Sequence, residues 1–185
     1  MTFEEAIAAP GEKFQVSGNR VKDGKLTVMI YALDENGAKQ LGFTHVPEAE
    51  HGALVADLTK RGLAIAETDW YCDFIWVANG ASITVYDSTH RVFWARENSA
   101  TLEDNTILRR SEFAKVISFA EDYVYRGVKV LLRSGEEVPL VTEAAASAMG
   151  DPTYSRNNLL METGWAPKIA VAIANWAGAD YQNLI

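Results

Sequence analysis

The sequence predicts an α+β protein, in which an antiparallel strand-rich body is joined to a helical tail. Asn-Gly pairs at 36–37 and 79–80 each lie between two alternating apolar runs, and a Ser-Gly pair lies at 134–135. Asn-Gly between apolar runs is the strongest short-range signal for a β-hairpin. After residue 142 the composition shifts to alanine-rich segments, which favour helix over strand.

A short helix is expected at the start of the chain, because Thr2 and Glu5 have the spacing of a capping box. Pro10-Gly11 ends this helix, since neither residue continues one. A second helix is expected from Pro47, where apolar residues begin to recur at helical spacing. These helices and the hairpin between them make up the expected first segment, residues 1–67.

The hairpin of this segment is expected to turn at Asn36-Gly37. This loop pairs Glu35 with Ala38 and, counting back along both strands, Ile30 with Phe43. Because side chains alternate along a strand, one side of the hairpin becomes a core face. The expected core face consists of Leu26, Val28, Ile30, Ala32, Leu41 and Phe43.

Residues 68–185 are expected to form a domain of seven antiparallel strands with closing helices. The first hairpin turns at Asn79-Gly80 and places Trp76 opposite Ile83. The other strands are expected at 92–96, 106–110, 112–119, 123–133 and 136–141. Thr142 and Ser155 have the residue type of helix caps, and Pro167 opens a last helix. No Pro-, Ser- or Gly-rich linker follows residue 67, so one compact body is equally consistent with the sequence.

Length and charge exclude several classes of protein. The chain has 185 residues, of which 48% are hydrophobic, enough for one good core or for two small lobes. The formal net charge is −8, and both segments are acidic. Nucleic acids and anionic membrane surfaces require basic patches, so neither is an expected partner. We find no signal peptide and no apolar run of about 18 residues, which makes the cytoplasm the expected compartment.

The later strands carry charges of both signs, and we expect these to form cross-strand ion pairs or to lie in solvent. A basic strip would require the cations to stand alone. Instead, Lys115, Arg126, Lys129 and Arg133 are accompanied by Glu112, Glu121, Glu136 and Glu137. The balance of charge therefore argues against an anion-binding surface.

No standard catalytic, metal-binding or phosphate-binding motif occurs in the chain. His45, His51 and His90 are the only histidines, and they have no metal-ligand spacing. Cys72 is the single cysteine, which excludes an internal disulfide and a zinc site of several cysteines. A thiol on the expected core face is inert. We therefore expect no catalytic residue, no metal and no cofactor.

Two sets of side chains are candidates for binding. The aromatic hairpin and the turn after it supply a candidate ligand pocket formed by Trp70, Asp73, Asp87, His90 and Trp94. In that turn a carboxylate, hydroxyls and an imidazole come together, although the same residue types are ordinary turn formers. A stripe in the tail, expected either to close the core or to bind a partner, consists of Trp165, Ile169, Ile173 and Trp176.

The strand order and hairpin spacing over residues 69–177 resemble those of the pleckstrin-homology-like superfold, a sandwich or barrel of seven antiparallel strands closed by a helix. The resemblance implies a tryptophan in the closing helix, a place that Trp165 or Trp176 would fill. Members that bind phosphoinositides carry lysine and arginine around the first hairpin loop, whereas residues 77–82 contain neither. The resemblance thus implies a fold without lipid-headgroup binding, and it implies no activity.

Three functions remain open from the sequence. The leading expectation is a non-catalytic interaction or scaffold module of the cytoplasm, with a protein partner or a second copy of itself. The alternative is a small-molecule-binding protein, or an enzyme of unrecognised type, that uses the pocket of the aromatic hairpin. The third is a structural subunit that requires an unlike partner. A deep concave pocket with convergent polar groups would favour the alternative.

Overall fold

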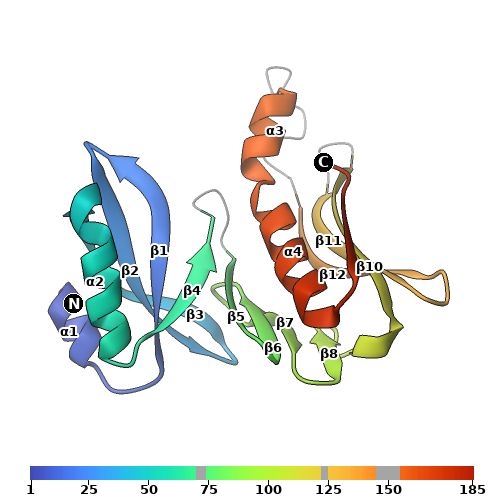
Figure 1. Ribbon diagram of the computed structural model, residues 1–185, viewed down its shortest axis with the longest axis horizontal. Coiled ribbons are helices and arrows are strands. Elements are labelled where there is room, and N and C mark those ends of the chain that lie inside the picture. The colour runs from blue at the N-terminus through green and yellow to red at the C-terminus, as the bar shows by residue number, and fades with distance from the viewer. Residues whose placement is uncertain (70–73, 122–124, 145–154) are drawn as a thin grey trace. The chain divides into compact units, whose positions relative to one another are not determined.

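The computed structural model describes residues 1–69, 74–121, 125–144 and 155–185 (Figure 1). The chain is divided into two compact units, one formed by Met1–Val77 with Val85–Arg91 and the other by Ala78–Thr84 with Val92–Ile185. The boundary expected after Glu67 lies inside a strand of the first unit. Strands dominate both units and helices accompany them, which confirms the α+β class.

The first unit contains a mixed sheet with helices against one face (Figure 1). Its elements are α1 (Phe3–Ala8), β1 (Lys13–Lys22), β2 (Lys25–Asp34), β3 (Gly37–Pro47), α2 (Glu48–Lys60), β4 (Ala64–Thr68) and most of β5 (Ile75–Asn79). The strand order is β3-β2-β1-β4-β5. β1 is antiparallel to β2 and parallel to β4, because α2 carries the chain across the sheet between β3 and β4.

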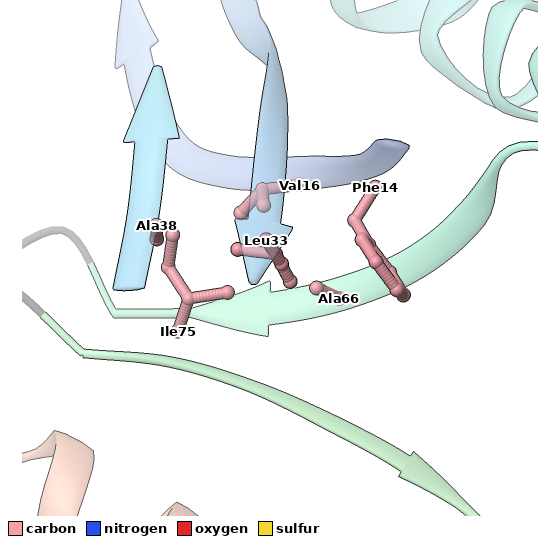
Figure 2. Close-up of a cluster of buried hydrophobic side chains, with 6 residues drawn as sticks. All are labelled: Phe14, Val16, Leu33, Ala38, Ala66 and Ile75. Carbon is pink, nitrogen blue, oxygen red and sulfur yellow. The ribbon is translucent and has the colours of Figure 1, made fainter. Parts of the chain in front are cut away.

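Both faces of this sheet bury apolar side chains. On one face, Ala6 of α1 and Leu58 of α2 pack with Val28 and Ile30 of β2. The cluster shown in Figure 2 consists of Phe14, Val16, Leu33, Ala38, Ala66 and Ile75. The expected capping box is confirmed, since the Thr2 side chain accepts a hydrogen bond from the Glu5 amide and the Glu5 carboxylate accepts one from the Thr2 amide.

The register expected for the first hairpin is wrong. The Asp34 carboxylate accepts a hydrogen bond from the Asn36 amide at 2.7 Å, so the loop closes one residue earlier and Asp34 pairs with Gly37. A bulge later in β3 moves the register again and pairs Phe43 with Met29. A slip of one residue exchanges the two faces of a strand. Phe43 is therefore 53% exposed and does not belong to the core face.

Gln15 in β1 is fully buried, and neither atom of its side-chain amide has a hydrogen-bond partner among the described residues. A buried amide without partners costs free energy that an apolar side chain of similar shape does not. We expect Gln15→Met to raise the free energy of unfolding by about 1–3 kcal/mol, as measured by urea denaturation. A loss of stability in this variant would mean that the amide is hydrogen-bonded in solution.

The second unit contains two short runs of sheet and a pair of helices (Figure 1). β6 (Ser82–Tyr86) is divided between the two units. The elements that follow it in the second unit are β7 (Arg91–Ala95), β8 (Ser99–Leu102), β9 (Ile107–Arg109), η1 (Arg110–Glu112), β10 (Phe113–Glu121), β11 (Tyr125–Leu132), β12 (Glu137–Ala144), α3 (Arg156–Glu162), α4 (Trp165–Ala177) and β13 (Asp180–Asn183). The strand orders are β7-β8-β9 and β12-β11-β10-β13. β13 is parallel to β10, whereas the other pairs in these runs are antiparallel.

α4 closes the core of the second unit against β10, β11 and β13. The tail stripe lies in this core, which is the first of its two expected roles: Trp165, Ile169, Ile173 and Trp176 have almost no exposed surface. The Trp176 indole packs edge-on against Phe113 and donates a hydrogen bond to the Arg96 carbonyl oxygen at 2.6 Å. An indole held in this way has no surface left for a partner.

Several turns and caps also differ from the expectation. β5 ends at Asn79 and β6 begins at Ser82, so the two-residue loop is Gly80-Ala81. Leu131 pairs with Glu137, so the loop before β12 is longer than Ser134-Gly135. Thr142 is a strand residue and not a helix cap, whereas Ser155 caps α3 as predicted by accepting from the Asn158 amide.

Candidate functional site

The structure brings together only part of the pocket predicted from the sequence. Trp70 and Asp73 lie outside the described residues. Asp87 and His90 lie together in the turn after β6, in the first unit. Trp94 is a half-buried residue of β7 in the second unit.

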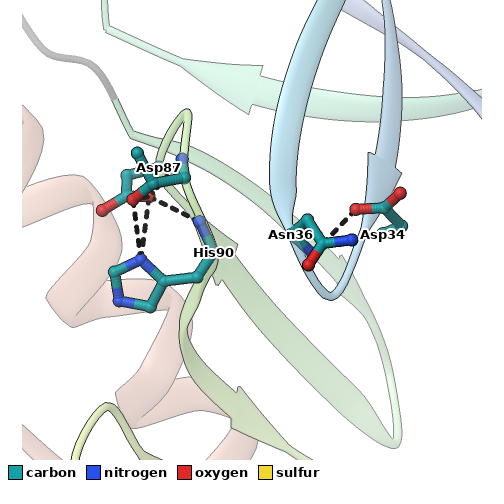
Figure 3. A network of polar contacts seen from close by, with 5 residues as sticks. Asp34, Asn36, Asp87 and His90 are labelled. Carbon is teal, nitrogen blue, oxygen red and sulfur yellow. Dashed lines mark hydrogen bonds and ion pairs between the residues drawn. The ribbon is translucent and has the colours of Figure 1, made fainter.

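Asp87 is the centre of a hydrogen-bond cluster in this turn (Figure 3). Its Oδ1 accepts from the Thr89 amide at 2.8 Å, from the Thr89 hydroxyl at 2.8 Å and from the His90 amide at 2.9 Å. Burial alone would raise the pKa of Asp87, but these hydrogen bonds from Thr89 and His90 hold the pKa below its ordinary value. The carboxylate is therefore stabilised in its charged form.

This cluster does not have the geometry of a catalytic triad. In a triad the carboxylate and the nucleophilic hydroxyl contact opposite nitrogens of the imidazole ring. Here His90 Nδ1 lies 2.8 Å from the Thr89 hydroxyl and 3.3 Å from Asp87 Oδ1, so both groups meet the same nitrogen. The arrangement matches a turn held by an aspartate side chain, as the residue types indicate.

The same turn supports the β2–β3 hairpin (Figure 3). The Ala38 amide donates to the Asp87 carbonyl oxygen at 2.8 Å, and the Arg91 amide donates to the Glu35 carbonyl oxygen at 3.3 Å. Gly37 has a φ of 105°, and a Cβ at this position would lie 2.5 Å from the Asp87 carbonyl oxygen. The two backbones thus meet where only glycine fits, which assigns the turn a structural role.

A concave site lies in the second unit, on the sheet of β10, β11 and β12. We call it the sheet hollow. It has a volume of about 370 Å³ and is lined by Phe119, Glu121, Tyr125, Lys129, Glu137, Pro139 and Thr142. Pockets for small ligands are typically concave and mostly apolar, with a few polar groups.

Strand alternation places the lining residues of the sheet hollow on one face of the sheet. Tyr125, Gly127 and Lys129 share one face of β11, because every second residue of a strand points to the same side. Gly127 pairs with Phe119 on one side and with Thr142 on the other. A Cβ at Gly127 would collide with the Val141 carbonyl oxygen beside a bulge in β12. The β12 backbone therefore passes close to β11 at Gly127, where no side chain fits.

The charges of the sheet hollow are partly paired. Lys129 Nζ lies 3.0 Å from Glu137 Oε2 and 5.0 Å from the centre of the Phe119 ring. This pair confirms the expectation of cross-strand ion pairs for Lys129 and Glu137. Glu121 is exposed, pairs with Tyr125 across the strands, and has no ion pair among the described residues. The lining residues therefore carry one carboxylate, that of Glu121, which no cation of the described residues neutralises.

The described residues contain no group of three or more His, Cys, Asp or Glu side chains that could hold a metal ion. His45 instead lies 3.0 Å from the Thr27 hydroxyl and edge-on to Phe43. Among the described helices, none is both long enough and apolar enough to cross a membrane.

No family model, curated protein or solved structure was found to match the chain. Function must therefore follow from the chemistry of the described side chains. The sequence interpretation treated Glu121, Lys129 and Glu137 only as solvated or paired charges. One sequence signal could have located the hollow. Phe119 and Glu121 are two positions apart on one strand, and Tyr125, Gly127 and Lys129 are two positions apart on the next, so each set lies on one face of its strand.

Proposed function

We propose that this protein is a non-catalytic interaction module and that the sheet hollow is its binding site for a small molecule carrying an apolar ring. The observation that carries the proposal is the hollow itself, in which two aromatic side chains and Pro139 accompany Lys129 and two carboxylates. Aromatic walls with a few polar groups are the usual composition of a small-molecule site.

The polar groups of the hollow support binding without chemistry. General acid–base catalysis requires a titratable group tuned toward neutral pH, in general by burial. Glu121 is exposed, and Lys129 and Glu137 neutralise each other at 3.0 Å. Among the described lining residues there is no histidine, cysteine or serine to act as a nucleophile or a base.

A fragment screen by thermal shift and ligand-observed NMR tests this function. We expect ring-bearing fragments to bind the complete chain, and we expect Tyr125→Ala to weaken that binding about tenfold, because loss of one stacked ring costs about 1 kcal/mol or more. Thr142→Trp, which places an indole in the hollow, is expected to block binding. Mass spectrometry is expected to recover each bound fragment unchanged.

Phe43→Ala provides the matched control, since Phe43 and Tyr125 are both 53% exposed and Phe43 lies in the first unit. This variant is expected to bind the same fragments as the unaltered chain. The proposal is wrong if Phe43→Ala abolishes binding, or if Tyr125→Ala and Thr142→Trp both leave it unchanged.

A further inference from the structure

The cation in the sheet hollow is already engaged by neighbouring groups. Lys129 Nζ contacts the Glu137 carboxylate at 3.0 Å and lies 5.0 Å from the centre of the Phe119 ring. The Lys129 side chain is also largely buried, at 17% exposure. An anionic ligand would have to separate Lys129 from Glu137, which opposes its binding.

In contrast to Lys129, the carboxylate of Glu121 is not engaged in an ion pair among the described residues, and it lies beside Tyr125. They are direct cross-strand partners at the ends of β10 and β11, so their side chains leave the sheet on the same face and close together. The Tyr125 ring is half exposed, and the Glu121 carboxylate has no ion pair among the described residues. An unpaired carboxylate beside an open aromatic face is the combination that recognises an organic ammonium ion.

The charge of the whole chain also favours a cationic ligand over an anionic one. The whole chain has a net charge of −8, which raises the local concentration of cations and lowers that of anions. The hollow of about 370 Å³ is large enough for a single ring with a short side chain.

On the basis of the proposed function, we infer that the sheet hollow selects a small organic cation, a protonated amine attached to an apolar ring. The ring packs between Phe119 and Tyr125, and the ammonium group pairs with Glu121. Lys129 remains on Glu137 and shapes the far wall.

Three probes of nearly equal size test the inference: 2-phenylethylammonium, the neutral 2-phenylethanol and the anion phenylacetate. Each is titrated into the isotope-labelled complete chain at neutral pH and low salt, and amide shifts are followed by NMR. We expect the ammonium probe to shift amides of β10, β11 and β12 and to bind about five- to thirtyfold more tightly than the alcohol. Phenylacetate is expected to bind most weakly, and added salt to reduce the preference for the cation.

Glu121→Gln keeps the shape of the side chain and removes its charge, so it should bring the ammonium and alcohol affinities together. Glu97→Gln makes the same charge change outside the hollow and should leave the preference intact. If the alcohol or phenylacetate binds in the hollow as tightly as the amine, the cation inference fails while the proposed function stands. If none of the probes shifts these amides, both fail.

Discussion

Replacing Arg126 by methionine is expected to lower the free energy of unfolding by about 3–5 kcal/mol, the usual cost of removing one partner from a buried ion pair. The Arg126 side chain is only 7% exposed, and it joins three elements. Its Nε donates to Glu143 of β12 at 3.2 Å, and its Nη1 donates to Glu162 of α3 at 2.9 Å. Without the guanidinium, these two carboxylates would face each other in a partly buried place.

Burial alone would lower the pKa of Arg126, but Glu162 and Glu143 raise it above its ordinary value. The guanidinium thus remains charged at neutral pH. Arg126→Lys is expected to recover only part of the stability, since an ammonium group cannot span both carboxylates as the planar fork does.

Urea denaturation followed by tryptophan fluorescence measures the effect. Adding Glu143→Gln and Glu162→Gln to Arg126→Met should restore a large part of the loss, because the carboxylates then no longer repel each other. Exposed ion pairs contribute only about 0–1 kcal/mol to stability. If Arg126→Met lowers the free energy of unfolding by less than about 1 kcal/mol, the result would contradict the buried position of this cluster.

Gly37→Ala is expected to destabilise the first unit by at least about 2–3 kcal/mol, since a strained backbone conformation and a steric overlap act together. Gly37 has a φ of 105°, which residues with a Cβ rarely adopt. The new Cβ would also lie 2.5–2.7 Å from backbone atoms of the turn at residues 87–90. Backbone atoms cannot move aside as the end of a flexible side chain can.

Gly24→Ala separates these two contributions. Gly24 also has a positive φ, of 71°, but a Cβ there would have no atom within 4 Å. Gly24→Ala is therefore expected to lower the free energy of unfolding only by the cost of the strained backbone conformation, about 1–2 kcal/mol. Equal losses in the two variants, measured by urea denaturation, would show that the β2–β3 loop does not contact the turn at Asp87 in solution.

Local signals in the sequence predicted local structure well. The capping box at Thr2, the Ser155 cap and the helix around Pro167 were all recoverable, because each depends on residues a few positions apart. The hairpins were located correctly but paired incorrectly. Side-chain hydrogen bonds in the loops, such as Asp34 to the Asn36 amide, changed which residues close each turn.

Bulges account for most of the remaining error in register. The hairpin of β11 and β12 begins one residue away from the expected pairing, and a bulge near Pro139 then returns Val128 and Val141 to the expected offset. A bulge leaves no clear trace in a pattern of alternating residues. The parallel strand β13 was missed for a different reason, since its partner β10 lies more than sixty residues earlier in the chain.

The candidate site was the least predictable part. Asp87 and His90 were singled out correctly as neighbours, and the structure shows that their turn holds a hairpin. The sheet hollow depends on the pairing of three strands, which does not follow from residue types alone. The pleckstrin-homology-like resemblance remains a prediction.

Contact between a bound ring and the sheet hollow is the most direct test of the function proposed for this chain. Intermolecular nuclear Overhauser effects should be recorded for the tightest fragment on the complete, unaltered chain. We predict contacts from the fragment ring to the side-chain protons of Phe119, Tyr125 and Thr142. Contacts confined to residues of the first unit, with none to these three side chains, would contradict it.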